Sequence, residues 1–318
     1  MASPNSFITS AGSLVTTHDQ IRAGFLRIAL EKNRVSDPYV KNALAFKAMV
    51  AHTTSADDFL GMPEIRPFLL TAAGLSDKSK HYLTDSDQTL AIKELIDKFL
   101  KPAGENYIDE TTFRYLLIKG DAVGGTMRNK IGALGEERFI RAIFSSMDVR
   151  EMECFWLPNT SSNWQKKKIG EANVESQVKA LSWNNKKGSR ILCFNMNVPI
   201  VKKNIDICLY SGTKNDYQNG NIVKYPNKAL MFGELKGGID PAGADEHWKT
   251  GNTALLRIRS AFQKEGLNRI KTSFVAAAIA NAMANEIYEQ LLNATLDNAA
   301  NLTNNNQLTA YCNWLIEI

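Results

Sequence analysis

The order of apolar and polar positions predicts helices in the first part of the chain and strands in the later part. Apolar residues follow helical spacing at 21–29 and again at 90–100, where Thr84-Asp85-Ser86-Asp87 offers N-cap candidates. Pro, Gly or Ser residues interrupt the pattern at 36–38, 62–63, 74–76 and 101–104. Because no alternating segment lies between these breaks, residues 1–118 are predicted to form a mostly helical domain.

The stretch GDAVGGT at 120–126 predicts a glycine-rich turn. It lacks the lysine and the spacing of a phosphate-binding loop, so it does not indicate nucleotide binding. Apolar spacing after it predicts a long helix at about 128–146.

Alternating apolar and polar residues then predict strands at 190–200 and 203–210, and apolar runs predict strands at 229–236 and 272–280. Helical patterns follow at about 244–264, 282–292 and 306–316. This order of elements predicts an α/β domain at 119–318, with a mixed sheet that is covered by helices on both faces.

Composition places the chain among ordinary globular proteins. Its 318 residues are 44% hydrophobic, which is enough to fill one large core or two smaller ones. Neither a signal peptide nor an apolar stretch of membrane-spanning length is evident, so a cytoplasmic location is expected. The cysteines at 154, 193, 208 and 312 are scattered, which favours reduced buried thiols over disulfides or a zinc site.

Positive charge is concentrated in one part of the chain. The net charge is +5, yet residues 162–203 alone hold nine Lys and Arg against two Glu. Such a band is expected where phosphates are bound, although a solvated lysine-rich surface is the commoner cause. The band runs directly into the strand that carries Asp206, which strengthens the first interpretation.

The candidate chemistry lies in the strands at 203–210 and 229–236. Glu234 and Lys236 share one strand face because side chains alternate, and their backbones lie roughly 6.5–7 Å apart. If the two strands pair as a hairpin, Asp206 sits opposite them. Two carboxylates and one ammonium group would then converge.

Carboxylate oxygens are the ligands that Mg²⁺ prefers, and a bound phosphate can supply further oxygens. Such an ion polarises a phosphoryl oxygen, and Lys236 can orient the attacking water. The pattern therefore predicts a phosphodiester-cleaving site. A solvent-facing Glu-x-Lys ion pair beside an edge-strand Asp is the alternative.

The segments VKKNIDICLY, GELKGGIDPAGADEHWKT, FRYLLIKGDAVGGTMRN and RAGFLRIALEKN resemble the AvaI/BsoBI group of type II restriction endonucleases over nearly the whole chain. The resemblance implies a restriction-endonuclease-like core with an additional N-terminal helical domain that embraces DNA. It also implies the catalytic pattern Asp then Glu-x-Lys, with Mg²⁺ as cofactor. Ile205 replaces the proline that commonly precedes the aspartate in this fold, a packing position that bears little on metal binding.

Residue roles follow from the same resemblance. Asp206 and Glu234 would be metal ligands, Lys236 the water-orienting cation and His247 a general base. Lys78 and Asp240 would contact base edges, and Lys203 would lie near the DNA. For Lys78, a solvated surface lysine is what the residues alone favour.

The resemblance further implies a bacterial homodimer that cuts double-stranded DNA at C-Y-C-G-R-G after the first C. The products would carry 5′-phosphates and four-base 5′ overhangs, and a cognate DNA methyltransferase would belong to the same system. Two other classes stay open: a DNA-binding module whose acidic cluster is not catalytic, and a non-specific repair or recombination nuclease.

Overall fold

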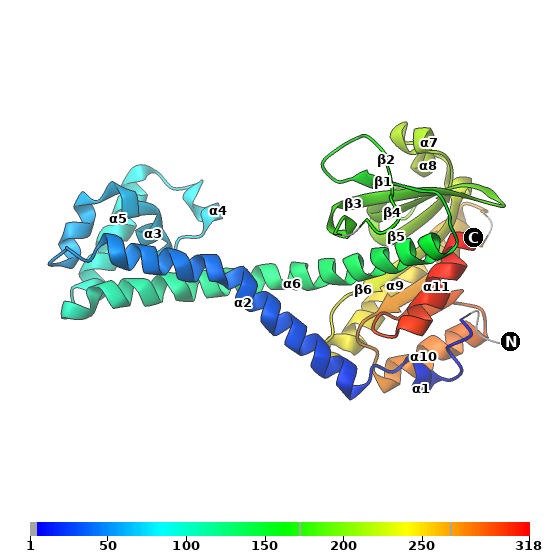
Figure 1. Ribbon diagram of the computed structural model, residues 1–318, viewed down its shortest axis with the longest axis horizontal. Coiled ribbons are helices and arrows are strands. Elements are labelled where there is room, and N and C mark those ends of the chain that lie inside the picture. Colours follow the sequence, from blue (N-terminus) through cyan, green and yellow to red (C-terminus); the bar gives the residue numbers. More distant parts are fainter. Residues whose placement is uncertain (1–4, 172, 268) are drawn as a thin grey trace. The chain divides into compact units, whose positions relative to one another are not determined.

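The computed structural model describes residues 5–171, 173–267 and 269–318, which form two compact units (Figure 1). One unit comprises Met1–Phe25 and Lys130–Ile318, and the other comprises Leu26–Asn129. The segment 5–25 therefore folds with the C-terminal part of the chain, whereas the sequence pattern groups it with the helical domain 1–118.

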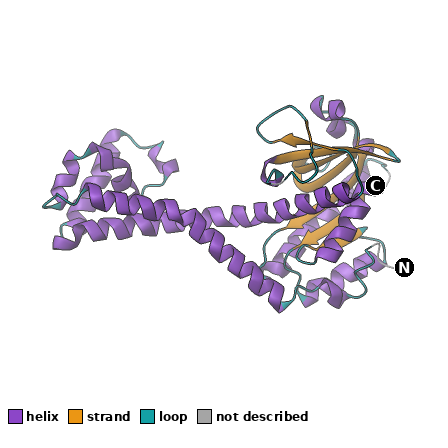
Figure 2. Ribbon diagram, in the orientation of Figure 1, coloured by secondary structure: helices purple, strands orange, loops and turns teal. Residues whose placement is uncertain are grey.

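The unit Leu26–Asn129 is helical throughout (Figure 2). Its elements, including the long helices α2 and α6 that continue past its boundaries, are α2 (His18–Met49), η1 (Ala56–Gly61), η2 (Pro63–Ile65), α3 (Arg66–Ala72), α4 (Asp77–Lys80), α5 (Asp85–Leu95), η3 (Ile96–Leu100), η4 (Gly104–Asn106) and α6 (Tyr107–Val149). The stacked rings of Phe46, Phe68 and Tyr115 join three of these helices, with centroids 4.0 and 3.8 Å apart. Aromatic packing of this kind supplies much of the core of a small helical unit.

Two breaks predicted from the sequence are wrong. Helix α2 continues through Pro38, where the ion pair between Asp37 and Lys41 spans the proline with a 2.6 Å N–O distance. The glycine-rich stretch 120–126 lies inside α6 and is not a turn. Val123 and Met127 on that helix are buried, so packing of one face outweighs the low helix propensity of glycine.

The other unit is built on one eight-stranded sheet with the order β2-β1-β3-β4-β5-β6-β7-β8. Its strands are β1 (Cys154–Pro158), β2 (Gln165–Lys166), β3 (Val178–Asn185), β4 (Gly188–Val198), β5 (Lys203–Ser211), β6 (Ala229–Lys236), β7 (Lys271–Ala276) and β8 (Asn298–Asn301). Neighbours from β2 to β6 are antiparallel, and β6, β7 and β8 are parallel. The predicted mixed sheet is confirmed, as is the antiparallel pairing of β5 with β6.

The helices of this unit are α1 (Ala11–Leu14), η5 (Glu175–Gln177), α7 (Lys214–Gln218), α8 (Asn221–Lys224), η6 (Pro226–Lys228), η7 (Pro241–Gly243), α9 (Ala244–Lys264), α10 (Asn281–Leu292), α11 (Asn305–Glu317), the first part of α2 and the last part of α6. Helices cover both faces of the sheet (Figure 1). On one face, α9 packs through Trp248 on Phe274 of β7, with ring centroids 5.0 Å apart. On the other face, Phe139 of α6 and Tyr311 of α11 lie together, 5.7 Å between centroids.

The predicted helix at 244–264 is confirmed at both ends, while the predicted strand 272–280 ends at Ala276. Strands β1, β2, β3 and β8 are not anticipated by the sequence pattern. All four cysteines are free and buried, as predicted. Among the described residues, no helix has the length and apolar character needed to cross a membrane.

Candidate active site

Strands β5 and β6 bring Asp206, Glu234 and Lys236 together, as the sequence predicts. The Lys236 ammonium group donates from Nζ to Asp206 Oδ2 at 2.9 Å and to Glu234 Oε2 at 2.6 Å. Glu234 is only 5% exposed, and the other two side chains are half-buried. A Glu-x-Lys pair that simply faces solvent would be far more exposed, so this alternative is wrong.

The site forms where the two strands stop pairing. Backbone pairing of β5 with β6 ends at Ile207 and Gly233, and the same register places Asp206 across from Glu234. Beyond that point, the backbone N–H of Leu235 donates to Asp206 Oδ2 at 2.9 Å. A carboxylate thus replaces a backbone carbonyl as acceptor, which satisfies the amide and fixes the orientation of Asp206.

The site holds two carboxylates but one ammonium group, and burial makes the uncompensated negative charge unfavourable. Burial, with repulsion from Asp206, raises the pKa of Glu234 to about 7, although Lys236 opposes the change. Burial acts to lower the pKa of Lys236, but the two carboxylates outweigh it and raise that pKa. A buried carboxylate that one ammonium group does not fully neutralise is a good position for a further cation.

The donor set fits a hard divalent cation. Asp206 and Glu234 supply carboxylate oxygens, which Mg²⁺ prefers, and a protein often holds this ion with one or two carboxylates plus water and phosphate oxygens. Within the described residues no group of three or more His, Cys, Asp or Glu gathers as a complete metal cage.

Glu136 on α6 is a fourth charged group near this site. Burial raises its pKa, a hydrogen bond from Asn195 opposes this, and the charge of Asp206 adds to the rise. Asn195 Nδ2 donates to Glu136 Oε2 at 2.7 Å. Asn195 has a φ of +48°, and the β4–β5 pairing skips this residue and the facing Asp206. Asn tolerates a positive φ better than most residues. The presence of Asn at position 195 is therefore the only sequence signal for this local backbone conformation.

His247 and Asp240 lie beyond the end of β6. The His247 side chain is exposed on α9, and its Nε2 atom lies 3.5 Å from the position a Cβ would take on Gly238. Its ring therefore lies against the segment that follows Lys236. Asp240 is exposed, and its Oδ1 accepts a hydrogen bond from the backbone N–H of Ala242 at 2.9 Å.

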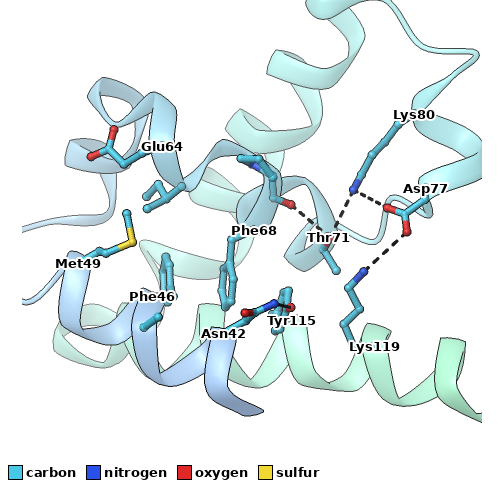
Figure 3. Close-up of a pocket in the computed structure, with 13 residues that line it drawn as sticks. Asn42, Phe46, Met49, Glu64, Phe68, Thr71, Asp77, Lys80, Tyr115 and Lys119 are labelled. Atoms are coloured by element: carbon cyan, nitrogen blue, oxygen red, sulfur yellow. Dashed lines mark hydrogen bonds and ion pairs between the residues drawn. The ribbon is translucent and has the colours of Figure 1, made fainter. Parts of the chain in front are cut away.

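Lys203 is exposed at the start of β5, three residues before Asp206. Lys78 is exposed on α4 in the helical unit, and Asp77 and Lys80 of the same helix line a pocket of about 380 Å³ (Figure 3). Figure 3 shows the pocket residue Asp77 between two lysines. Lys80 Nζ donates to Asp77 Oδ1 at 3.0 Å, and Lys119 Nζ lies 3.9 Å from Asp77 Oδ2. The ion pair with Lys119 ties α4, and with it Lys78, to α6.

Comparison with known proteins places this site in a family. The model of the restriction endonuclease BsobI family matches residues 5–318. The chain is 46% identical over 314 residues to the type II restriction enzyme BsoBI of Geobacillus stearothermophilus, covering 98% of this chain and 97% of that enzyme. It is 45% identical over 311 residues to the type II restriction enzymes AvaI of a Nostoc strain and of Anabaena variabilis, covering 98% of each chain. With its fold, its Asp and Glu-x-Lys cluster and these matches over nearly its full length, the chain belongs to the BsobI family of restriction endonucleases.

Proposed function

We propose that this chain is a type II restriction endonuclease that hydrolyses double-stranded DNA in a Mg²⁺-dependent reaction. The expected site is the degenerate six-base sequence C-Y-C-G-R-G, cut after the first C to leave 5′-phosphates and four-base 5′ overhangs. The observation that carries the proposal is the convergence of Asp206, Glu234 and Lys236 at the point where β5 and β6 part. Family membership supports the choice of DNA as substrate.

Asp206 and Glu234 would hold the Mg²⁺ ion. When bound there, the ion would polarise the scissile phosphate and make a bound water more acidic. Lys236 would orient the attacking water and stabilise negative charge on the phosphate, a role supported by the hydrogen bonds from its ammonium group to both carboxylates. A buried position strengthens this electrostatic effect.

His247 is proposed as the general base that takes a proton from the attacking water. Its ring lies against Gly238, two residues beyond Lys236, so the chain brings it toward the same end of β6. A positioned general base typically contributes a 10²–10⁴-fold effect on rate. The alternative is that His247 only packs at the start of α9 beside the buried Trp248.

Asp240 and Lys78 are proposed to read base edges in the major groove, and Lys203 to contact the DNA backbone. A carboxylate accepts from cytosine N4, and a lysine donates to guanine O6 or N7. All three side chains are exposed, as such contacts require. Asp240→Ala or Lys78→Ala should weaken discrimination by about 1–3 kcal/mol for each lost base contact. Equal losses on cognate and random DNA would count against base reading.

A homodimer is proposed because a two-fold symmetric site is matched most simply by a two-fold symmetric protein with one active centre in each subunit. The helical domain, taken from the sequence as 1–118, is proposed to embrace the DNA. A cognate DNA methyltransferase would protect the host genome as a functional partner.

Digestion of a sequenced plasmid, with mapping of the ends, tests the proposal. Discrete fragments whose 5′ ends map to C-Y-C-G-R-G, formed only with Mg²⁺, are the expected result. The absence of any Mg²⁺-dependent cutting would favour a DNA-binding module, and a smear of fragments would favour a non-specific nuclease. Either result overturns the proposal.

Three substitutions test the assignment of the centre. Asp206→Ala, Glu234→Ala and Lys236→Ala should each abolish cleavage and leave specific DNA binding largely intact, because all three side chains act on the scissile phosphate and not on the bases. Gel-shift titration and single-turnover cleavage with the same duplex separate the two effects. Turnover near the wild-type rate in any variant would remove that residue from the site.

A further inference from the structure

The segment Gly237–Asp240 connects the active centre to the proposed base-reading carboxylate. It directly follows Lys236, whose backbone carbonyl accepts a hydrogen bond from the backbone N–H of Ala277 at 2.8 Å. Ala277 in turn accepts at its carbonyl from Thr16 Oγ1 at 2.9 Å. The beginning of the segment is therefore tied to the neighbouring strand β7 and to the N-terminal segment.

On one side, this segment touches the backbone of α6. A Cβ atom added to Gly135 would lie 2.5 Å from Gly237 Cα, and one added to Gly237 would lie 2.8 Å from the carbonyl oxygen of Ile131. Real Cβ atoms essentially never come within 3.0 Å of such neighbours. The contact joins backbone atoms of α6 to backbone atoms of Gly237. No flexible side chain lies between the two segments that could move aside to make room.

On the other side, the same segment touches α2. A Cβ atom added to Gly24 would lie 2.4 Å from Ile239 Cγ1, 3.0 Å from its Cβ and 3.1 Å from its Cγ2. Ile239 is only 5% exposed, so it has little space into which to retreat. Gly24, Gly135 and the segment all belong to the unit that holds the sheet.

We propose that Gly24 and Gly135 are positioning residues that set the distance between Lys236 and Asp240. Their missing side chains let α2 and α6 close on Gly237–Asp240 and hold it in one path from the catalytic centre to the exposed Asp240. The role in specificity rests on the proposed function of Asp240. Displacement of a reacting or recognising group by about 1 Å can cost about 100-fold in rate, so a small shift of this segment has a large effect.

Gly135→Ala is the first test, with Gly132→Ala as its matched control. Both lie on α6 three residues apart, and alanine gains helix propensity at both. A Cβ on Gly132 meets nothing within 4 Å. Gly135→Ala should therefore lower the single-turnover rate on the cognate duplex by about 100-fold, while Gly132→Ala stays within about 2-fold of wild type.

Sequence discrimination is the second quantity to measure, because a loss of stability alone does not change it. The cleavage rate on the cognate duplex, divided by the rate on a duplex with one substituted base pair, should fall at least 10-fold in folded Gly135→Ala. Slow cleavage by Gly135→Ala, together with a wild-type ratio of cleavage rates on the two duplexes in Asp240→Ala, would support the positioning of Lys236 by Gly135 and would refute the base-reading role of Asp240. Wild-type rate and wild-type discrimination in folded Gly135→Ala would overturn the proposal.

Gly24→Ala provides a second test that does not depend on the folding of Gly135→Ala. The most severe obstruction is Cγ1 of Ile239 at 2.4 Å, and Ile239→Ala removes this atom and Cγ2, leaving only the Cβ at 3.0 Å. The double variant Gly24→Ala/Ile239→Ala should therefore recover at least 10-fold of the rate and discrimination lost in Gly24→Ala. A double variant that is no better than Gly24→Ala, or losses in the two single variants that simply add, would refute the contact as the cause.

Discussion

Replacement of Glu234 by glutamine should stabilise the metal-free protein at alkaline pH. The carboxyl group is buried beside Asp206, and the two together raise its pKa from the usual 4.5 to about 7. Above pH 7 the folded protein therefore holds a negative charge in a place that disfavours it. Glutamine keeps nearly the same shape and carries no charge, so the cost of that charge disappears.

The pKa gives the size and the sign of this effect. Each pH unit corresponds to 1.36 kcal/mol, so the rise of the Glu234 pKa sets an upper limit of about 3 kcal/mol on the destabilisation. Between pH 4.5 and 7 the folded state binds the proton more tightly than the unfolded state, so this group's contribution to stability is lost as pH rises through that window. The gain from Glu234→Gln should thus be about 2 kcal/mol larger at pH 8 than at pH 5.

Thermal unfolding of the metal-free protein with chelator present measures the effect. For a unit of this size, 1 kcal/mol shifts the Tm by about 2–4 °C, so Glu234→Gln should unfold about 4–10 °C above wild type at pH 8. Glu289→Gln, on the exposed side of α10, controls for the simple loss of one negative charge. Addition of Mg²⁺ should raise the Tm of wild type more than that of Glu234→Gln, because the ion relieves the same repulsion.

A Tm difference between Glu234→Gln and wild type that is the same at pH 5 and pH 8 would refute the reasoning. So would a variant that is less stable than wild type at pH 8, since the ion pair with Lys236 would then outweigh the burial of the charge.

Three further predictions concern residues around the centre. His247→Ala should fold, dimerise and bind the site normally but cleave 10²–10⁴-fold more slowly, and one fewer ionisation should shape the acidic limb of its pH–rate profile; unchanged single-turnover rates would exclude the general-base role. Lys203→Ala should weaken binding to all DNA sequences and reduce the salt dependence by about one counterion, so a loss confined to cognate DNA in a salt titration would contradict it. Asn195→Ala should raise the pKa of Glu136 further, because it removes the hydrogen bond that opposes the effect of burial; a carboxyl NMR titration that finds no change, or the same change in Asn197→Ala, would contradict that assignment.

Much of the active centre could be predicted from the sequence, since it depends on local geometry. Alternation along a strand puts Glu234 and Lys236 on one face wherever that strand lies. The apolar runs around them are long enough to mark two strands, and the structure confirms that β5 and β6 pair with Asp206 across from Glu234. The helix at 244–264 is equally clear from its periodic apolar face.

Tertiary contacts determine several elements that the local sequence pattern does not predict or predicts wrongly. Strand β8 reads Asn-Ala-Ala-Asn, which has low strand propensity, yet it is buried beside β7 because Asn301 finds partners in the N-terminal segment. Helix α2 passes the exposed Pro38, and α6 passes the glycines at 120–126 because packing of Val123 and Met127 outweighs the low propensity of glycine.

The sequence by itself therefore determined that Asp206, Glu234 and Lys236 converge, because their spacing follows from the repeat of a single strand and its neighbour. Only the tertiary structure decided what surrounds that cluster. Glu136 reaches the site from a helix 70 residues before Asp206, and Gly135 touches Gly237 across 102 residues of chain. Such contacts depend on how whole elements pack against each other, and no periodicity within a short stretch of sequence encodes that arrangement.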